Sequence, residues 1–117
     1  MEVVINTQVK KREISKNALR AIFGMRMHKW ADGTQVKVFV LQDADQVHKE
    51  FCKEVLQVFP HQLRRSWDRL IFSGIGQAPS LVYSEEEMYE KVATTLGAIG
   101  YMKKEKIDDS VRVLVVK

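Results

Sequence analysis

The sequence predicts one α/β domain over residues 1–117, with a small mixed β-sheet of about four to five strands and helices on both faces. Three observations lead to this fold class. Strand-like and helix-like segments alternate along the chain. Residues 36–42, VKVFVLQ, are apolar on one face and nearly so on the other, which is typical of a strand covered on both sides. A length of 117 residues fits a single domain.

The first predicted elements are a strand and a helix. Residues 2–6, EVVIN, are rich in β-branched side chains and predict a short strand. Ser15 has the chemistry of a helix N-cap and Gly24 that of a C-cap. The apolar residues between them share one face: Leu19, Ile22 and Phe23. This spacing predicts a helix that packs on the sheet.

Residues 43–59 predict an amphipathic helix after the central strand, with Asp43 or Asp45 as its N-cap. Its apolar side chains fall on one face: Val47, Phe51, Cys52, Val55 and Leu56. Its polar side chains fall on the other: His48, Lys49, Lys53 and Glu54. We therefore expect His48 to face solvent and Cys52 to be a small core residue without a histidine beside it.

The next helix is predicted to begin at Pro60, a residue that suits the first helical position. Its inward side chains are Leu63, Trp67, Leu70 and Ile71. Its outer side chains are Arg64, Arg65, Asp68 and Arg69. Trp67 is therefore expected in the core, whereas Trp30, in an irregular segment, is open to either a core or a stacking role.

A last helix and two strands complete the predicted fold. Ser84 and Glu87 have the spacing of a capping box, and Gly97 ends the helix that they begin. The inward side chains of this helix are Met88, Val92 and Leu96. Residues 98–102, AIGYM, and 111–116, VRVLVV, then read as strands on either side of a charged turn.

The composition excludes several classes of protein. Apolar residues make up 45% and charged residues 29%, as in an ordinary soluble globular domain. A single cysteine cannot form a disulfide within the chain, and no apolar run is long enough to span a membrane. The net charge of +4 is a mild basic excess whose clusters contain no interleaved aromatics, so no nucleic-acid surface is expected.

The segment 72–79, FSGIGQAP, raises the question of a phosphate-binding loop, because it holds Ser73, Gly74 and Gly76. The third glycine of a dinucleotide fingerprint is missing, and so is the lysine of a P-loop. A helix precedes the segment where a strand would be needed. A helix-ending turn is therefore the favoured interpretation.

No constellation in the sequence predicts catalysis, a metal site or a cofactor. The histidines His28, His48 and His61 lack the short spacing of metal ligands and are expected to face solvent. The acidic run 85–87 lies at a helix start, where the helix dipole stabilises negative charge. No base, nucleophile and oxyanion hole come together, so an enzyme is not expected.

The order of several phrases carries more information than any single motif. The strand VVIN is followed by a helix ending AIFGM, then by KWADGTQVKVFVL, FCKEVLQVFPHQLRRSWDRLIFSGIGQAP, VYSEEEMYEKV and GAIGYM. This order resembles the substrate-binding proteins of phosphate ABC transporters, in the short phosphate-binding-like branch of the type 2 periplasmic binding protein superfamily. The resemblance implies a single lobe of that fold, export to the periplasm with removal of a signal peptide, and an ancestral role in binding a small oxyanion such as phosphate.

The same resemblance identifies candidate site residues. In the family, an R-x-D-x-S-G-T-like loop after the central strand opens the next helix and holds the anion. Here Asp43 matches the aspartate, Leu41 stands at the arginine position, and Asp45, Gln46 and Val47 stand at the serine, glycine and threonine positions. The hydroxyl donors and the arginine are absent, and a carboxylate repels phosphate. The resemblance thus implies a degenerate phosphate loop.

The glycine-rich segment corresponds to a connection that follows a helix in the family. With its polar residues included, the candidate oxyanion-binding residues are Asp43, Asp45, Gln46, Val47, Ser73, Gly74 and Gly76. The function that the resemblance implies is a non-enzymatic binding protein of the cell envelope. An alternative is a protein–protein interaction module derived from that lobe, as a homodimer or with an envelope partner. A less favoured alternative is a basic binder of nucleic acid or another anionic polymer.

Overall fold

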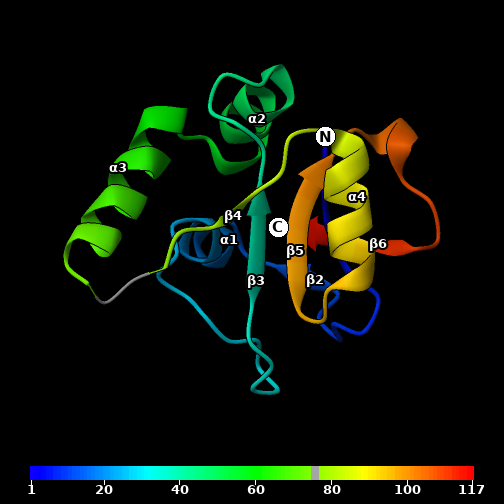
Figure 1. Ribbon diagram of the computed structural model, residues 1–117. Helices are drawn as coiled ribbons and strands as arrows, with labels where there is room; N and C mark the ends of the chain where they lie inside the picture. Colours follow the sequence, from blue (N-terminus) through cyan, green and yellow to red (C-terminus); the bar gives the residue numbers. More distant parts are fainter. Residues whose placement is uncertain (75–76) are drawn as a thin grey trace.

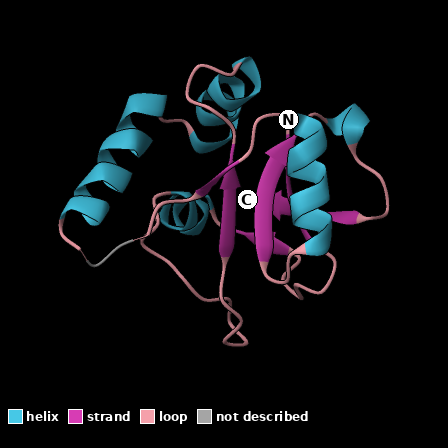
Figure 2. Ribbon diagram, viewed as in Figure 1, coloured by secondary structure: helices cyan, strands magenta, loops and turns pink. Residues whose placement is uncertain are grey.

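The computed structural model describes residues 1–74 and 77–117 and shows a central sheet with helices packed around it (Figures 1 and 2). The strands are β1 (Glu2–Asn6), β2 (Glu13–Ile14), β3 (Lys37–Val40), β4 (Ser80–Leu81), β5 (Ala98–Met102) and β6 (Val111–Val116). The α-helices are α1 (Lys16–Phe23), α2 (Gln46–Phe51), α3 (Pro60–Phe72) and α4 (Glu85–Thr94). A π-helical turn, η1 (Cys52–Leu56), and a 3₁₀ turn, η2 (Lys104–Lys106), complete the described elements.

The sheet is mixed, as predicted, and its strand order is β2-β6-β1-β5-β3-β4. β1 is antiparallel to both neighbours, with Val4 aligned to Gly100 of β5 and to Val113 of β6. β3 is parallel to β5 and β4, and β2 is parallel to β6. The described residues form six strands, where about four to five were expected. The additional strands are β2 and β4, two residues each, whose pairing depends on distant neighbours more than on any local pattern.

Helices cover both faces of the sheet, as two successive residues of β5 demonstrate. Gly100 faces α4, because a Cβ at this position would lie 2.5 Å from Sδ of Met88. Tyr101 points to the opposite face. There its ring stacks on Phe51 with centroids 3.9 Å apart and lies 5.9 Å from the ring of Phe23. One face is therefore covered by α4, and the other by α1 and the end of α2 (Figure 1).

Both predicted caps of α1 are confirmed. Oγ of Ser15 accepts a hydrogen bond from the backbone N–H of Ala18 at 3.1 Å. The N–H of Gly24 donates to the carbonyl of Arg20 at 2.8 Å. The apolar residues of this helix are buried as predicted: Leu19, Ile22 and Phe23.

The central strand is shorter than the predicted range 36–42. It ends at Val40, because the backbone N–H of Leu41 donates to the hydroxyl of Tyr101 at 2.9 Å instead of to a neighbouring strand. Burial of successive residues from Val38 onward confirms a strand covered on both faces.

The predicted helix 43–59 is divided into α2 and η1. The carbonyl of Cys52 accepts hydrogen bonds from the N–H groups of Gln57 and Val58, the second at 2.9 Å, so the chain closes a wider turn than an α-helix would. Gln57 then takes a left-handed conformation with φ 58° and ψ 44° and ends the turn. The predicted inward face is buried or half-buried at Val47, Phe51, Cys52, Val55 and Leu56.

The core position of Trp67 in α3 is confirmed. Its side chain is buried, and its indole N–H donates to the carbonyl of Phe23 at the end of α1 at 2.7 Å. The other inward residues are buried or half-buried at Leu63 and Leu70. The prediction for Ile71 is wrong, because 46% of it is exposed. The residues that anchor α3 lie earlier in the helix, and Phe72 beside Ile71 is also in solvent.

The helix α4 begins at Ser84, as predicted. Oγ of Ser84 accepts from the N–H of Glu87 at 3.1 Å. The carboxylate of Glu87 accepts from the N–H of Tyr83 at 2.8 Å, one residue before the amide that a capping box would use. The inward position predicted for Leu96 is wrong, because 63% of it is exposed. The helix ends at Thr94, so Leu96 lies outside its periodicity.

The connection between α4 and β5 is fixed by polar contacts. Gly97 has φ 81°, and a Cβ there would lie 2.1 Å from the carbonyl oxygen of Gln35. The indole N–H of Trp30 donates to the carbonyl of Gly97 at 3.0 Å. The side-chain amide of Asn6, at the end of β1, donates to the carbonyl of Val92 at 3.0 Å. These contacts hold the end of α4 against the sheet and set the direction in which the chain enters β5.

Candidate functional site

The candidate anion loop lies where β3 ends and α2 begins. β3 and β5 are parallel, so their carboxyl ends meet at one edge of the sheet. We call this the carboxyl edge; it is the upper edge in Figure 1, and α2 begins there. In open α/β sheets, ligands bind outside the carboxyl ends of the strands. The predicted residues that follow β3 therefore stand where this class of fold holds its ligands.

Asp45 caps α2 with its own carboxylate. Its backbone is extended, with φ −68° and ψ 132°, and its Oδ1 accepts from the N–H of Val47 at 2.8 Å. Gln46, the first residue of the helix, is exposed, and Val47 is buried behind it. A helix start offers unpaired N–H groups to an anion. Here one of those donors is already bound to an internal carboxylate.

Asp43 forms a two-point ion pair with an arginine from α3. Nε and Nη2 of Arg64 donate to the two carboxylate oxygens of Asp43 at 3.0 and 3.1 Å. The guanidinium also lies 5.1 Å from the ring centroid of Trp67, a cation–π contact. The hydrogen bond that Arg64 donates to Asp43 raises the pKa of Arg64. The sequence pattern placed Arg64 only on an outer helix face, because the pair joins two segments that are separated in the chain by α2 and η1.

The expectation that His48 faces solvent is wrong. Its side chain is completely buried below the loop, and its Nδ1 is hydrogen-bonded to the hydroxyl of Tyr101. Its Nε2 lies 3.6 Å from Sγ of Cys52 and 4.0 Å from Oδ1 of Asp43. The expectation that Cys52 has no histidine beside it is therefore also wrong. A histidine at this position is buried because Tyr101, from β5, provides the polar partner that burial requires.

The protonation states of this buried cluster follow from its burial. Loss of water lowers the pKa of His48, and the carboxylates of Asp43 and Asp45 offset part of that effect. Burial raises the pKa of the Cys52 thiol to about 12 and also raises the pKa of Tyr101. At neutral pH the three side chains are uncharged. Cys52 is thus a protonated thiol without solvent access, which is not the state of a nucleophile.

The remaining predicted site residues lie elsewhere. Oγ of Ser73 donates to the carbonyl of Leu70, and Gly74 takes φ 78° as the chain leaves α3. Ser73 lies roughly 13 Å further along the axis of α3 than Arg64, which contacts the loop. Gly76 lies outside the described residues. The structure therefore brings Asp43, Asp45, Gln46 and Val47 together and leaves Ser73 and Gly74 at the far end of α3.

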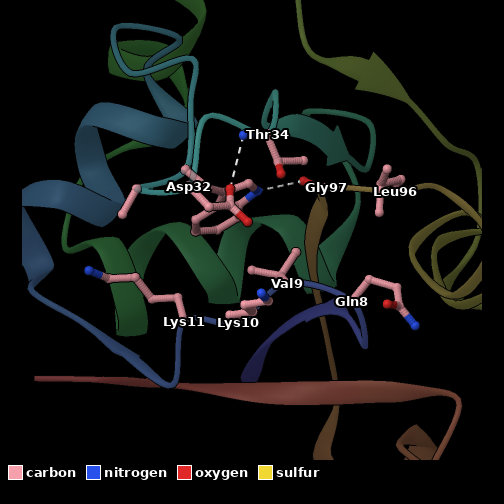
Figure 3. A pocket seen from close by; sticks show the side chains of 10 residues that line it. Gln8, Val9, Lys10, Lys11, Asp32, Thr34, Leu96 and Gly97 are labelled. Atoms are coloured by element: carbon pink, nitrogen blue, oxygen red, sulfur yellow. Dashed lines mark hydrogen bonds between the residues drawn. The ribbon is translucent and has the colours of Figure 1, made fainter.

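A small cavity lies at the opposite edge of the sheet (Figure 3). It has a volume of about 210 Å³ and is lined by residues 8–11, residues 30–32, Thr34, Leu96 and Gly97. The buried indole of Trp30 lines it, and the hydrogen bond from Trp30 to Gly97 is a dashed line in Figure 3. Asp32 accepts from the N–H of Thr34 at 2.9 Å, which lowers the pKa of Asp32. The sequence left Trp30 open to a core or a stacking role, and the structure shows that it is a core residue.

Two further features of the described residues bear on function. No group of three or more histidine, cysteine, aspartate or glutamate side chains in residues 1–74 and 77–117 could hold a metal ion. Within the same residues, no helix is both long and apolar enough to cross a membrane. The arrangement at the carboxyl edge is anionic, since Asp43 and Asp45 lie together and Arg64 is engaged by Asp43.

No family model and no curated protein matches the chain. Solved structures do. An ABC-type phosphate transport receptor from Vibrio cholerae has a TM-score of 0.77 at 14% identity, covering 98% of this chain and 45% of that chain. A structure described as a phosphate ABC transporter substrate-binding protein with bound phosphate, from Clostridium perfringens, has a TM-score of 0.76 at 14% identity, covering 98% and 44%. The PstS protein of Borrelia burgdorferi has a TM-score of 0.68 at 15% identity, covering 98% and 46%.

These similarities confirm the predicted resemblance at the level of fold. The chain has the fold of one lobe of phosphate ABC transporter substrate-binding proteins, and it spans less than half of the length of the structures that it matches. A sequence identity of 14–15% supports a conclusion about the fold alone.

Proposed function

We propose that this chain is a non-enzymatic binding domain, built like the ligand-binding lobe of a phosphate-binding protein, whose phosphate loop is closed by its own carboxylates. The fold supports the binding role, because the solved structures that share it are phosphate transport proteins. The claim that the loop is closed rests on the hydrogen bond from the N–H of Val47 to the carboxylate of Asp45. An anion at this loop would compete with a carboxylate that is already in place.

Two physical effects oppose phosphate at the loop. The first is repulsion between the anion and the charges of Asp43 and Asp45. The second is that the guanidinium of Arg64 is already paired with Asp43 at 3.0 Å. Lys49, one turn into α2, offsets the repulsion only in part, because an exposed charge pair contributes at most about 1 kcal/mol. A single lobe also buries less of a small ligand than two lobes closed around it.

Calorimetric titration of the chain with phosphate and with sulfate tests this proposal. We expect no binding tighter than about millimolar for either anion. Asp45→Ser is expected to strengthen phosphate binding, because serine still caps a helix while the negative charge is removed. Glu50→Gln is the matched control, since it removes one charge from α2 away from the loop. Micromolar phosphate binding by the unmodified chain would overturn the proposal of a closed loop.

The same resemblance supports an extracytoplasmic location. We infer a periplasmic protein whose signal peptide is removed, in keeping with the transport role of the similar structures. Fractionation of the native host, followed by N-terminal sequencing of the protein, tests this part. Recovery of the protein from the cytosol, with no processing of its N-terminus, would contradict it.

A second candidate role is an interaction domain that binds another protein. Exposed aromatic side chains favour it, because 67% of Phe59 and 95% of Phe72 are accessible at the two ends of α3. Aromatic side chains are enriched in protein–protein interfaces relative to the rest of the protein surface. A homodimer in which two lobes face each other is one form of this role. Sedimentation equilibrium distinguishes a dimer from a monomer that needs a different partner.

A further inference from the structure

We propose that the groove between η1 and the beginning of α3 is a docking site for an acidic peptide segment of a partner protein that carries an apolar anchor residue. The inference deepens the second role above by naming a site and the chemistry of its partner. Of the residues that line it, only Lys49 also lies close to the loop of Asp43 and Asp45. Phe59→Ala changes the groove alone and Asp45→Ser changes the loop alone, so failure of the docking site and failure of the closed loop can be told apart.

The groove has the size of a binding site. Its volume is about 750 Å³, within the range of roughly 300–1,000 Å³ that is typical of ligand pockets. The residues that line it come from α2, η1, the connection and the first turn of α3: Lys49, Lys53, Gln57, Val58, Phe59, Pro60 and Gln62. The two ends of this surface are thus held by separate helices.

The apolar part of the groove is presented in a fixed position. Phe59 is the N-cap residue of α3, and its backbone N–H donates to Oε1 of Gln62 at 2.7 Å. Its exposed ring stacks on the ring of His61, with centroids 5.5 Å apart and planes 12° apart. Val58 and Pro60 flank it and are half-buried. An aromatic that is exposed yet held in place needs little ordering when a partner binds, which favours affinity.

The charge of the groove selects the partner. Lys49 and Lys53 are exposed and four residues apart, so they lie on the same side of the helix. In the part of the chain that the structure describes, neither ammonium group has a carboxylate within 4.0 Å. The lining residues include these two lysines and no acidic side chain. Carboxylates on either side of an apolar anchor would complement this surface.

The backbone of the groove is preformed. A π-helical turn is rare and occurs frequently at functional sites. Gln57 closes it in a left-handed conformation that non-glycine residues seldom take. From the inner side, Nε of Arg20 donates to the carbonyl of Leu56 at 2.7 Å and holds the end of the turn.

A second copy of this chain could offer its acidic run at the start of α4 only by giving up internal contacts. Its acidic run at the start of α4 is engaged internally: Glu85 accepts from the N–H of Lys103 at 2.9 Å, and Glu86 pairs with Lys106 at 3.4 Å. Glu87 accepts from the N–H of Tyr83. Docking of this run would break contacts that the fold already uses.

Two pools of fluorescent peptides test the proposal with the full chain. Each peptide has about nine residues, with Phe, Leu or Trp at the centre. The flanks are drawn from Asp and Glu in one pool and from Lys and Arg in the other. We expect the acidic pool alone to bind, with weaker binding at high salt and with NMR shifts of the amides of Lys53, Val58 and Phe59. Equal binding of the two pools, or no binding of the acidic pool, would overturn the proposal.

Charge-reversal and truncation variants locate the site. Lys49→Glu with Lys53→Glu should weaken binding of the acidic pool by at least about tenfold. Lys103→Glu with Lys104→Glu makes the same change in net charge elsewhere and should have a much smaller effect. Phe59→Ala should also weaken binding while leaving both lysines in place. An equal loss in the two double variants, or no loss in Phe59→Ala, would show that the peptides bind by net charge alone and would refute the docking site.

Discussion

The hydroxyl of Tyr101 links β3 to α2, because it accepts the N–H of Leu41 at 2.9 Å and is hydrogen-bonded to Nδ1 of His48. Since Leu41 already donates to this oxygen, we assign the hydroxyl proton to the bond with His48. The remaining proton of the imidazole is then on Nε2, which faces Cys52 and Asp43. One tyrosine thus fixes the end of the central strand and the first turns of the helix that follows.

The burial of His48 predicts a loss of stability in weak acid. The pKa of His48 is lowered in the folded protein from its ordinary value of 6.5, so the unfolded chain binds a proton first as the pH falls. The stabilisation by neutral, buried His48 is complete above pH 6.5 and is lost as the pH falls below that value. The free energy of unfolding then decreases with a slope that approaches about 1.4 kcal/mol per pH unit. Urea unfolding between about pH 7.5 and 5.5 measures this slope.

The matched control for this prediction is an exposed histidine. His61→Gln should leave the slope nearly as it is, whereas His48→Gln should flatten it in this pH window, after an initial loss of stability at every pH. A slope that persists in His48→Gln would contradict the assignment of the effect to His48.

The core position of Trp67 predicts a large loss on truncation. Trp67→Ala should lower the free energy of unfolding by roughly 3–5 kcal/mol, because it removes a buried aromatic and its hydrogen bond to Phe23. Phe72→Ala, in the same helix but 95% exposed, should change stability by no more than about 0.5 kcal/mol. Chemical denaturation of both variants gives the comparison. A loss well under about 1 kcal/mol for Trp67→Ala would mean that the indole does not support the core.

Gly97 and Gly33 form a matched pair for backbone strain. Both have positive φ, 81° and 91° respectively, but a Cβ on Gly33 meets nothing within 4 Å, whereas one on Gly97 would lie 2.1 Å from the carbonyl oxygen of Gln35. Gly33→Ala should therefore cost about 1–2 kcal/mol for the left-handed conformation alone. Gly97→Ala should cost clearly more, because the backbone of Gln35 must move as well. Equal losses in thermal unfolding would mean that the contact is relieved without cost.

Local patterns were sufficient for much of the fold. Ser15, Asp45 and Ser84 cap helices as their chemistry predicts, and Trp67 is buried at the spacing of its helix face. Each of these inferences depends on residues within a few positions along the chain. The alternation of strand-like and helix-like segments, together with the apolar faces of residues 36–42, predicted the sheet that is covered on both sides.

The features that the sequence did not reveal depend on distant partners. His48 lies on the polar side of its helix pattern and is buried only because Tyr101, far along the chain, reaches it from β5. The ion pair of Asp43 with Arg64 likewise crosses between elements. Leu96 follows the apolar period of α4, but the helix ends before it. A pattern within one element contains no information about such contacts.

The central claim is that Asp45 occupies the donor that an anion would use. Amide NMR of the chain during a phosphate titration tests it most directly, with the N–H of Val47 as the reporter. At about 5 mM phosphate we expect no shift of the Val47 amide in the unmodified chain, a clear shift in Asp45→Ser, and none in Glu50→Gln. A saturating shift of the Val47 amide in the unmodified chain would contradict the account and would mean that the loop still binds its anion.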